Sequence, residues 1–387
     1  MRRGHVAPAK AKSSGVASSA AATAVLGRAT MPFDTPRPAP DSRADHRAIA
    51  WWLLGIAGLI WVMVALGGAT RLTGSGLSIM EWAPLRGTLP PMSQAEWQRL
   101  YDLYRGIPQY ELINQGFGIE GFKRIFWLEW LHRLWGRLIG LAFLLPLAWF
   151  WLRGRIPAGL KPRLVLLFLL GGLQGVVGWF MVASGFFEDS TTVSPYRLVL
   201  HLGLALVLYG MVLWTALGLL RPERDGPAHP AGLRRLVHLT AGLVVLAMLA
   251  GGFVAGLRAG LTYNTFPLMD GQWLPDGYAM LSPAWRNLTE NIAAVQWNHR
   301  LLATLAGLAA LAAAAWSHHA LRPGFARGAL LALGGAVLLQ YALGVATLLM
   351  VVPVWLGTLH QAMAVGVLTA SLVALHALRP ATRPGRS

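Results

Sequence analysis

The sequence WLHRL at residues 130–134 returns as WNHRL at residues 297–301. Each copy lies in a long apolar segment, and each is followed by a second histidine in a later apolar segment, His201 in the first case and His360 in the second. Repetition at this scale indicates that one structural unit occurs twice. The motif therefore predicts two halves of the same fold.

A glycine motif marks the first apolar segment of each half. GGATR at 67–71 is followed by GLS at 76–78, and GGF at 251–253 is followed by Arg258 and by GLT at 260–262. Both copies stand at the end of their segment, so the repeat includes that segment and the connection after it.

Composition indicates that these segments cross a membrane. Of the 387 residues, 55% are hydrophobic and 13% are charged, and the mean hydropathy is +0.50. Soluble proteins carry about 25% charged residues. Eight segments are long enough to cross about 30 Å of hydrocarbon, at residues 48–69, 124–151, 164–185, 195–220, 236–257, 292–316, 328–351 and 355–377. We predict an all-α, polytopic membrane protein whose eight transmembrane helices form two repeated four-helix bundles, both in the same orientation.

Charge predicts the topology. The net charge of +17 comes from basic residues in the tails and short connections, which membrane orientation explains better than nucleic-acid binding. The basic connections mark the cytoplasmic side, with residues Arg153, Arg155, Lys161, Arg163, Arg221, Arg224, Arg234, Arg235, Arg322 and Arg327. Both termini then lie in the cytoplasm.

The chain divides into four parts on this basis. A disordered cytoplasmic tail is predicted at 1–45, an N-terminal half at 46–221, a C-terminal half at 222–378 and a second cytoplasmic tail at 379–387. The first tail is rich in Arg and poor in acids, as mitochondrial transit peptides are. A bacterial plasma membrane, favoured by the excess of Arg over Lys, and a mitochondrial inner membrane therefore both remain open.

The N-terminal half contains a long outer loop at residues 70–123. Loops of this length are usually functional or packed as a lid. An amphipathic stretch near 93–105 favours a packed lid, and a solvated connection is the alternative.

Four histidines are the candidate ligands of the chain. His132, His201, His299 and His360 lie in the second, fourth, sixth and eighth segments, all about 10 Å inside the outer ends. Ionisable residues inside a membrane are functional candidates by default. Haem iron takes axial imidazoles, and a macrocycle between two helices of a bundle satisfies a facing pair. We predict two bis-histidine haem sites, with histidines that only hydrogen-bond across helices as the alternative.

Other metal chemistry is disfavoured by the composition. The chain has no cysteine, which excludes disulfides, thiolate ligands and covalently attached c-type haem. One histidine per helix gives no closed shell for zinc or copper. The remaining histidines are predicted to be interfacial or solvated, namely His5, His46, His229, His238, His318, His319 and His376.

Arginines cluster near the same outer ends as the four histidines. They are candidate partners of haem propionates, although some could instead extend to lipid headgroups. The set is Arg71, Arg133, Arg197, Arg258 and Arg300.

One polar position differs between the halves. Glu129 precedes His132 by three residues, and Gln296 takes the same place before His299. A carboxylate one turn from a histidine shares its helix face. It can act as a base on water or stabilise a cationic intermediate, which an amide cannot. Glu129 is therefore the candidate catalytic residue, and a role in orienting the imidazole is the alternative.

Five ordered motifs together resemble the haem A synthase family, over residues 48–377. They are Gly67–Ser78, Glu129–Arg133, Pro195–Arg197 with His201, Trp297–Arg300 and Leu359–Gln361. Some members of that family carry a cysteine pair in the outer loops, and this chain has none.

The resemblance implies an enzyme that oxidises the C8 methyl of haem O to a formyl group through two successive hydroxylations, with oxygen from water. It also implies that His132 and His201 receive the substrate haem O, while His299 and His360 hold a haem b cofactor. Haem O synthase and assembly factors of the terminal oxidase are the implied partners, besides the lipid bilayer and an electron acceptor. A di-haem b-type electron-transfer cytochrome is the alternative function, although such bundles usually hold ligands at both depths of the membrane.

Overall fold

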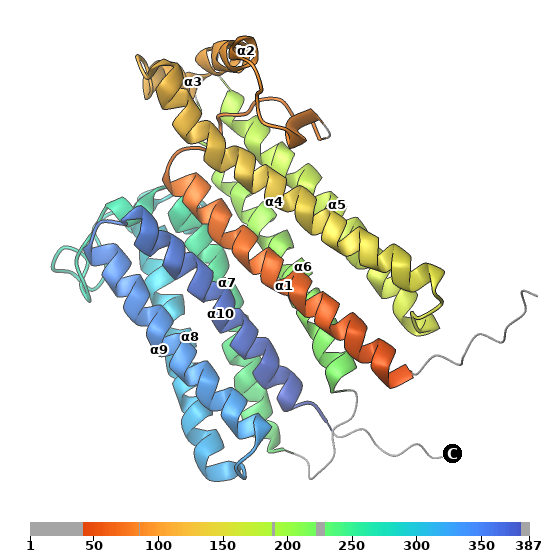
Figure 1. Ribbon diagram of the computed structural model, residues 1–387. Helices are drawn as coiled ribbons and strands as arrows, with labels where there is room; N and C mark the ends of the chain where they lie inside the picture. The colour runs from red at the N-terminus through yellow and green to blue at the C-terminus, as the bar shows by residue number, and fades with distance from the viewer. Residues whose placement is uncertain (1–41, 85, 188–189, 222–228, 381–387) are drawn as a thin grey trace, which may run out of the picture. The chain divides into compact units, whose positions relative to one another are not determined.

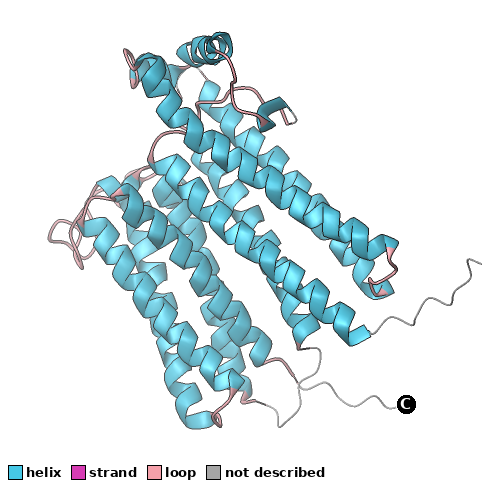
Figure 2. Cartoon of the chain, viewed as in Figure 1, coloured by secondary structure: helices cyan, strands magenta, loops and turns pink. Residues whose placement is uncertain are grey.

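The computed structural model describes residues 42–84, 86–187, 190–221 and 229–380, and every regular element in these ranges is a helix (Figures 1 and 2). Eight of the helices are long and apolar enough to cross a membrane. They are α1 (Ser42–Leu72), α4 (Gly118–Leu152), α5 (Lys161–Ala183), α6 (Pro195–Leu220), α7 (Ala231–Gly256), α8 (Ile292–Ala320), α9 (Phe325–Leu349) and α10 (Val354–Ala377). The predicted all-α membrane fold is confirmed. Most of the two predicted tails lies outside the described residues.

Two helices, α1 and α4, begin six residues before their predicted apolar segments. α1 starts at Ser42, so residues 42–45, which we assigned to the N-terminal tail, are helical. α4 starts at Gly118 rather than near 124. Its first turns are not apolar throughout, but Phe122 is fully buried there against Tyr101 and Tyr104. Local packing, which a hydropathy window does not see, extends this helix.

The long helices contact one another in two closed rings. In the first, α1 contacts α4, α4 contacts α5, α5 contacts α6, and α6 returns to α1. In the second, α7, α8, α9 and α10 follow the same order. Between the rings α1 contacts α10 and α6 contacts α7. The first helix of each ring therefore contacts the last helix of the other ring. This pattern fits the predicted repeat.

Hydrophobic cores fill one end of both rings. The first core joins the early part of α1, the late parts of α4 and α6, and the start of α5. The second joins the corresponding parts of α7, α8, α9 and α10. The opposite end carries the long connections 73–117 and 257–291. We call it the outer end, because the sequence predicts that it faces away from the cytoplasm.

The first long connection is a packed lid. It contains η1 (Arg86–Thr88), α2 (Gln94–Arg105) and α3 (Pro108–Leu112), and α2 coincides with the amphipathic stretch expected near 93–105. The ring of Tyr104 is buried, its hydroxyl donates to Gln109 Oε1 at 3.1 Å, and burial raises the pKa of this phenol. Gln109 in turn donates to the carbonyl of Gly74 at 3.0 Å. The lid is thus bonded to the segment that follows α1.

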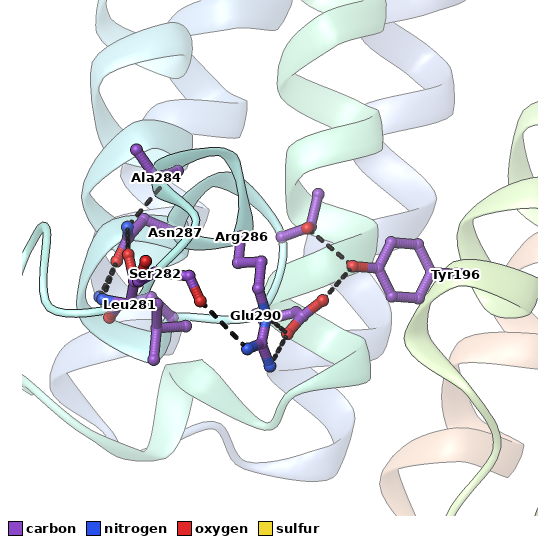
Figure 3. A network of polar contacts seen from close by, with 9 residues as sticks. Tyr196, Leu281, Ser282, Ala284, Arg286, Asn287 and Glu290 are labelled. Atoms are coloured by element: carbon purple, nitrogen blue, oxygen red, sulfur yellow. Dashed lines mark hydrogen bonds and ion pairs between the residues drawn. The ribbon is translucent and has the colours of Figure 1, made fainter.

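The second long connection is fixed by a residue of the other half (Figure 3). It contains η4 (Ala259–Leu261) and η5 (Ala284–Leu288). Tyr196, at the start of α6, donates to Glu290 Oε1 at 2.7 Å and lies 2.9 Å from Thr289 Oγ1. Arg286 also donates to Glu290, at 2.7 Å. Glu290 therefore accepts hydrogen bonds from both halves of the chain. The hydrogen bond from Tyr196 and, after it, the one from Arg286 lower the pKa of the Glu290 carboxyl group.

Candidate functional site

The four predicted ligands line one continuous cavity of ≈ 1610 Å³, whose walls are mostly apolar. His201 and His360 each lie six residues after the start of a helix that begins at the outer end, and His299 lies seven residues after such a start. His132 is farther along α4 only because that helix is longer at its outer end. All four side chains are half-buried with an edge on the cavity. The structure therefore brings together the histidines that the sequence singled out.

Within each ring the two histidines face across the bundle. α4 and α6 are opposite members of the first ring, and α8 and α10 are opposite members of the second. His132 and His201 therefore lie on facing helices of the first ring, and His299 and His360 on facing helices of the second, and all four line the same cavity. A planar group held by both members of a pair would lie at the centre of a ring.

Glycines on the neighbouring helices make room for each ring. A Cβ atom added to Gly67 would lie 3.4 Å from His132 Nε2, and one added to Gly251 would lie 3.0 Å from His299 Cε1. The second pair is matched in the same way. Gly178 and Gly344 would each place a Cβ 2.9 Å from Cε1 of the adjacent histidine, His201 and His360 respectively. A Cβ at Gly178, Gly251 or Gly344 would press on the imidazole, and one at Gly67 would touch it.

The double glycines of the sequence repeat also join the halves. Gly68 packs against the amide of Gln361 on α10, where a Cβ would approach Oε1 to 2.5 Å. Gly252 packs in the same manner against Val199 and Leu202 on α6. In each double glycine, the first residue leaves room for the histidine of its own half. The second allows close packing against a helix of the other half.

Two glutamines that were not predicted from the sequence lie beside the histidines. Gln174 Nε2 lies 3.2 Å from His201 Nδ1 and donates to the carbonyl of His201 at 2.9 Å. Gln340 Nε2 lies 3.2 Å from His360 Nδ1. Each Oε1 is buried without a hydrogen-bond partner among the described residues. The repeated pattern Q-x-x-x-G at 174–178 and 340–344 is the signal that would have found them.

His299 has a different partner. Its Nδ1 lies 2.9 Å from the carbonyl oxygen of Ala247 on α7. A carbonyl can only accept, so Nδ1 carries the proton and Nε2 keeps the lone pair that a metal needs. Such a hydrogen bond sets the orientation and tautomer of a ligand histidine.

Glu129 is buried and surrounded by donors. Its Oε2 accepts from Ser78 Oγ at 2.7 Å and from the backbone N–H of Ile79 at 2.9 Å. Its Oε1 accepts from Arg133 Nε at 3.1 Å and Nη2 at 2.6 Å. Arg133 continues to the carbonyls of Ile79 and Glu81. The carboxylate thus ties the GLS segment after α1 to α4, while it still lines the cavity.

Gln296 makes the corresponding connection in the C-terminal half, but it donates hydrogen bonds to the loop where Glu129 accepts them. Its Nε2 donates to the carbonyls of Ala259 at 2.8 Å and Thr262 at 2.6 Å, and its Oε1 accepts from Arg300 at 2.9 Å. The segment after α7 therefore presents acceptors where the segment after α1 presents donors. Each loop fits its own side chain, carboxylate in one half and amide in the other.

Gln296→Glu is expected to destabilise the C-terminal half. Two carbonyl oxygens would lose their donor and face a carboxylate, which costs about 1–3 kcal/mol. The measurement is the thermal unfolding of the purified protein in detergent. Gln94→Glu, the same change at the exposed start of α2, is the control and should leave the midpoint unchanged. Equal midpoints for both variants would contradict the assigned fit.

The five candidate arginines occupy different surroundings. Arg71 and Arg258 line the cavity and are close enough for their charges to interact, and Arg71 Nη2 is buried without a hydrogen-bond partner among the described residues. Arg133 and Arg300 also line it, but their guanidinium groups are engaged by the loops. Arg197 does not line it, since it donates to the carbonyl of Phe180 at 2.8 Å and stacks on that ring.

One prediction about the other histidines is wrong. His376, expected at an interface or in solvent, is only 2% exposed. It packs edge-on against Trp214 and contacts Arg379. The end of α10 lies against α6, which covers the ring. Among the described residues, no cluster of three or more His, Cys, Asp or Glu side chains forms a candidate metal site.

Comparison with known proteins agrees with the motifs. Residues 50–372 match the family model COX15-CtaA, described as cytochrome oxidase assembly protein. The heme A synthase of Granulibacter bethesdensis is 61% identical over 335 residues, which cover 87% of this chain and 88% of that protein. The heme A synthases of Rhodospirillum centenum and Parvibaculum lavamentivorans are 50% and 47% identical, over 89% and 87% of this chain and 91% and 95% of their own lengths. The family resemblance seen in the sequence is thereby confirmed: the chain belongs to the COX15-CtaA family of cytochrome oxidase assembly proteins.

Proposed function

We propose that this protein is a haem A synthase, which oxidises the C8 methyl of haem O to a formyl group by two successive hydroxylations with oxygen from water. The observation that carries the proposal is the pairing of four histidines across two four-helix rings that share one apolar cavity. The relatives are named heme A synthase, which supports the formation of haem A.

The residues around the histidines fit a haem. A bis-histidine iron porphyrin has an imidazole on each face and lies between apolar walls. The four glycines next to the imidazoles leave the space that a Cβ would fill. Arg71 and Arg258 supply positive charge at the outer end of the cavity, and we assign them as the leading propionate contacts. Arg133, Arg197 and Arg300 are weaker candidates because their guanidinium groups are already engaged.

We assign the haem b cofactor to His299 and His360, and the substrate haem O to His132 and His201. The hydrogen bond from His299 to the carbonyl of Ala247 supports this division, because it prepares Nε2 for stable coordination. A bound haem b supplies one-electron redox chemistry, which can relay electrons from the substrate to an external acceptor.

Glu129 is assigned to the reaction at the substrate methyl group. Each hydroxylation removes two electrons and two protons from the substrate and water, so positive charge develops next to the porphyrin edge. A carboxylate held by Ser78, Ile79 and Arg133 supplies a fixed negative charge there without reorganising. Service as a base on water would require one of these hydrogen bonds to open, so the contacts favour electrostatic stabilisation. Glu129 makes its hydrogen bonds to the lid and Arg133, which gives less support to a role in orienting His132.

The proposed setting is the plasma membrane of a bacterium, with both termini in the cytoplasm. The relatives named above come from bacteria. Haem O, a lipophilic porphyrin made by haem O synthase, would arrive from that membrane. The product would pass to assembly factors of a terminal oxidase.

Pigment analysis tests the function. The protein should be purified after expression in cells that make haem O, and its extracted pigments separated by reverse-phase chromatography. We expect haem B together with haem O and haem A. Haem B as sole pigment would refute the proposal and support the di-haem electron-transfer cytochrome instead.

A further inference from the structure

The two rings differ at the helix pair that includes Gln174 in one ring, α4 with α5, and Gln340 in the other, α8 with α9. In the C-terminal ring α8 and α9 close on each other. Val337 is 6% exposed and packs at Gly307, where a Cβ would meet Val337 Cγ1 at 3.5 Å. Tyr341 places its hydroxyl 2.9 Å from Thr304 Oγ1 across the same pair. One apolar contact and one hydrogen bond thus seal this side of the cavity.

In the N-terminal ring the corresponding positions are glycines. Matching His132 with His299, and Gln174 with Gln340, places Gly171 where α9 has Val337, and Gly175 where α9 has Tyr341. Gly140 takes the place of Gly307. A Cβ on any of these three glycines would have no heavy atom within 4 Å. Neither sealing contact is therefore made between α4 and α5, although the two helices are neighbours (Figure 1).

The cavity reaches the surface through this gap. Several residues of α4 and α5 line the cavity and are also exposed: Leu138, Leu141, Leu144, Leu169, Leu173, Val176 and Trp179, at 39–61%. On α8 and α9 every cavity-lining residue is buried or half-buried. Because the exposed residues are apolar and belong to membrane-spanning helices, the opening faces hydrocarbon rather than water.

The open side is also deeper. Counted inward from the matched histidines, the lining on α4 extends from His132 to Leu144, and on α8 it extends from His299 only to Gly307. From matched starting points the N-terminal lining therefore continues about 6 Å farther toward the inner end, at 1.5 Å per residue. The additional walls, Leu141, Phe143 and Leu144, are apolar and carry no charge.

We propose that the cleft between α4 and α5, formed around Gly140, Gly171 and Gly175, binds the isoprenoid chain of the substrate porphyrin and admits it from the bilayer. The inference rests on the proposed function. Haem O differs from haem b in carrying a long hydrocarbon chain in place of a vinyl group. A chain of this kind needs an apolar channel that continues from the porphyrin edge, which only the N-terminal ring provides. The sealed pair α8 and α9 leaves room for a haem without the chain, so the same difference sorts the two haems between the two sites.

Gly171→Val tests the inference, because it restores the residue that seals the C-terminal ring. The added side chain points into open space, so the fold tolerates it. The double variant Gly171→Val/Gly175→Tyr copies both sealing residues. Gly335→Val is the matched control, since Gly335 on α9 is exposed, has nothing within 4 Å of a Cβ, and does not line the cavity.

The measurement is haem binding, independent of turnover. Protein that already contains haem b is purified from a host that does not make haem O and is titrated with haem O and, separately, with haem B, while the absorbance of the second bis-histidine centre is recorded. We expect Gly171→Val to weaken haem O binding at least about tenfold, which corresponds to about 1.4 kcal/mol. Binding of haem B to the same site should stay unchanged, and Gly335→Val should alter neither.

Three results would overturn the inference. Haem O affinity that is unchanged in both the single and the double variant would show that the chain lies elsewhere. An equal loss for haem O and haem B would show that the gap holds the porphyrin or a membrane lipid rather than the chain. If the unaltered protein bound no haem O through His132 and His201, as judged by His132→Ala, the proposed function itself would fail together with the inference.

Discussion

His299→Ala is expected to remove nearly all haem b from the purified protein. The imidazole is the ligand whose tautomer is fixed by Ala247, and the adjoining Gly251 offers no substitute donor. With one axial ligand left, the low-spin bis-histidine spectrum should disappear. The measurement is the haem B content of purified protein, by pyridine haemochrome assay.

His319→Ala is the control for this variant, because His319 is an exposed residue near the end of the same helix. It should keep the full haem content. Haem b retained in His299→Ala at the level of this control would mean that the cofactor is assigned to the wrong histidines.

Glu129→Gln is expected to lower haem A formation by about 10²–10³-fold, the loss typical of removing a preorganised electrostatic group. The amide has a similar shape, so both haem sites should stay loaded. It removes the negative charge, and its amino group would face donors such as Arg133 or Ile79. The measurement is the ratio of haem A to haem O in extracted pigment.

Two controls separate charge from lid attachment. Ser78→Ala removes one hydrogen bond to Glu129 but keeps the charge, and it should retain most of the haem A formation. Glu120→Gln changes an exposed carboxylate on the same helix and should have no effect. Undiminished haem A in Glu129→Gln with normal haem loading would exclude the catalytic role. An equally large loss in Ser78→Ala would assign the effect to the lid.

Hydropathy predicted the membrane-spanning helices well because each crosses a nonpolar layer alone, and its apolar length is a local property. Most of the predicted ends lie within about four residues of the ends in the structure. The early start of α4 is different. It depends on Phe122 packing against Tyr104, a contact with a separate helix, and no window along the chain contains that information.

The histidines could be found from the sequence because helix register and the repeat place them at one depth. Gln174 and Gln340 could not be recognised by the same reasoning, since a single amide in an apolar helix acquires meaning only from its neighbour on the next helix. Glu129 shows a related limit. The contrast with Gln296 was visible, but Ser78 and Ile79, which explain the carboxylate, come from a loop far away in the chain.

The exchanged contacts between the rings, α1 with α10 and α6 with α7, are those expected of a two-fold dimer of four-helix subunits. In a true homodimer every substitution appears twice, so a donor loop for a carboxylate or a glycine gap would arise at both sites. Covalent fusion removes that constraint. Gly171 can stand opposite Gly140 in one ring while Val337 seals Gly307 in the other. Under the proposed function, this broken symmetry lets a single polypeptide combine a permanent redox centre with an exchangeable one.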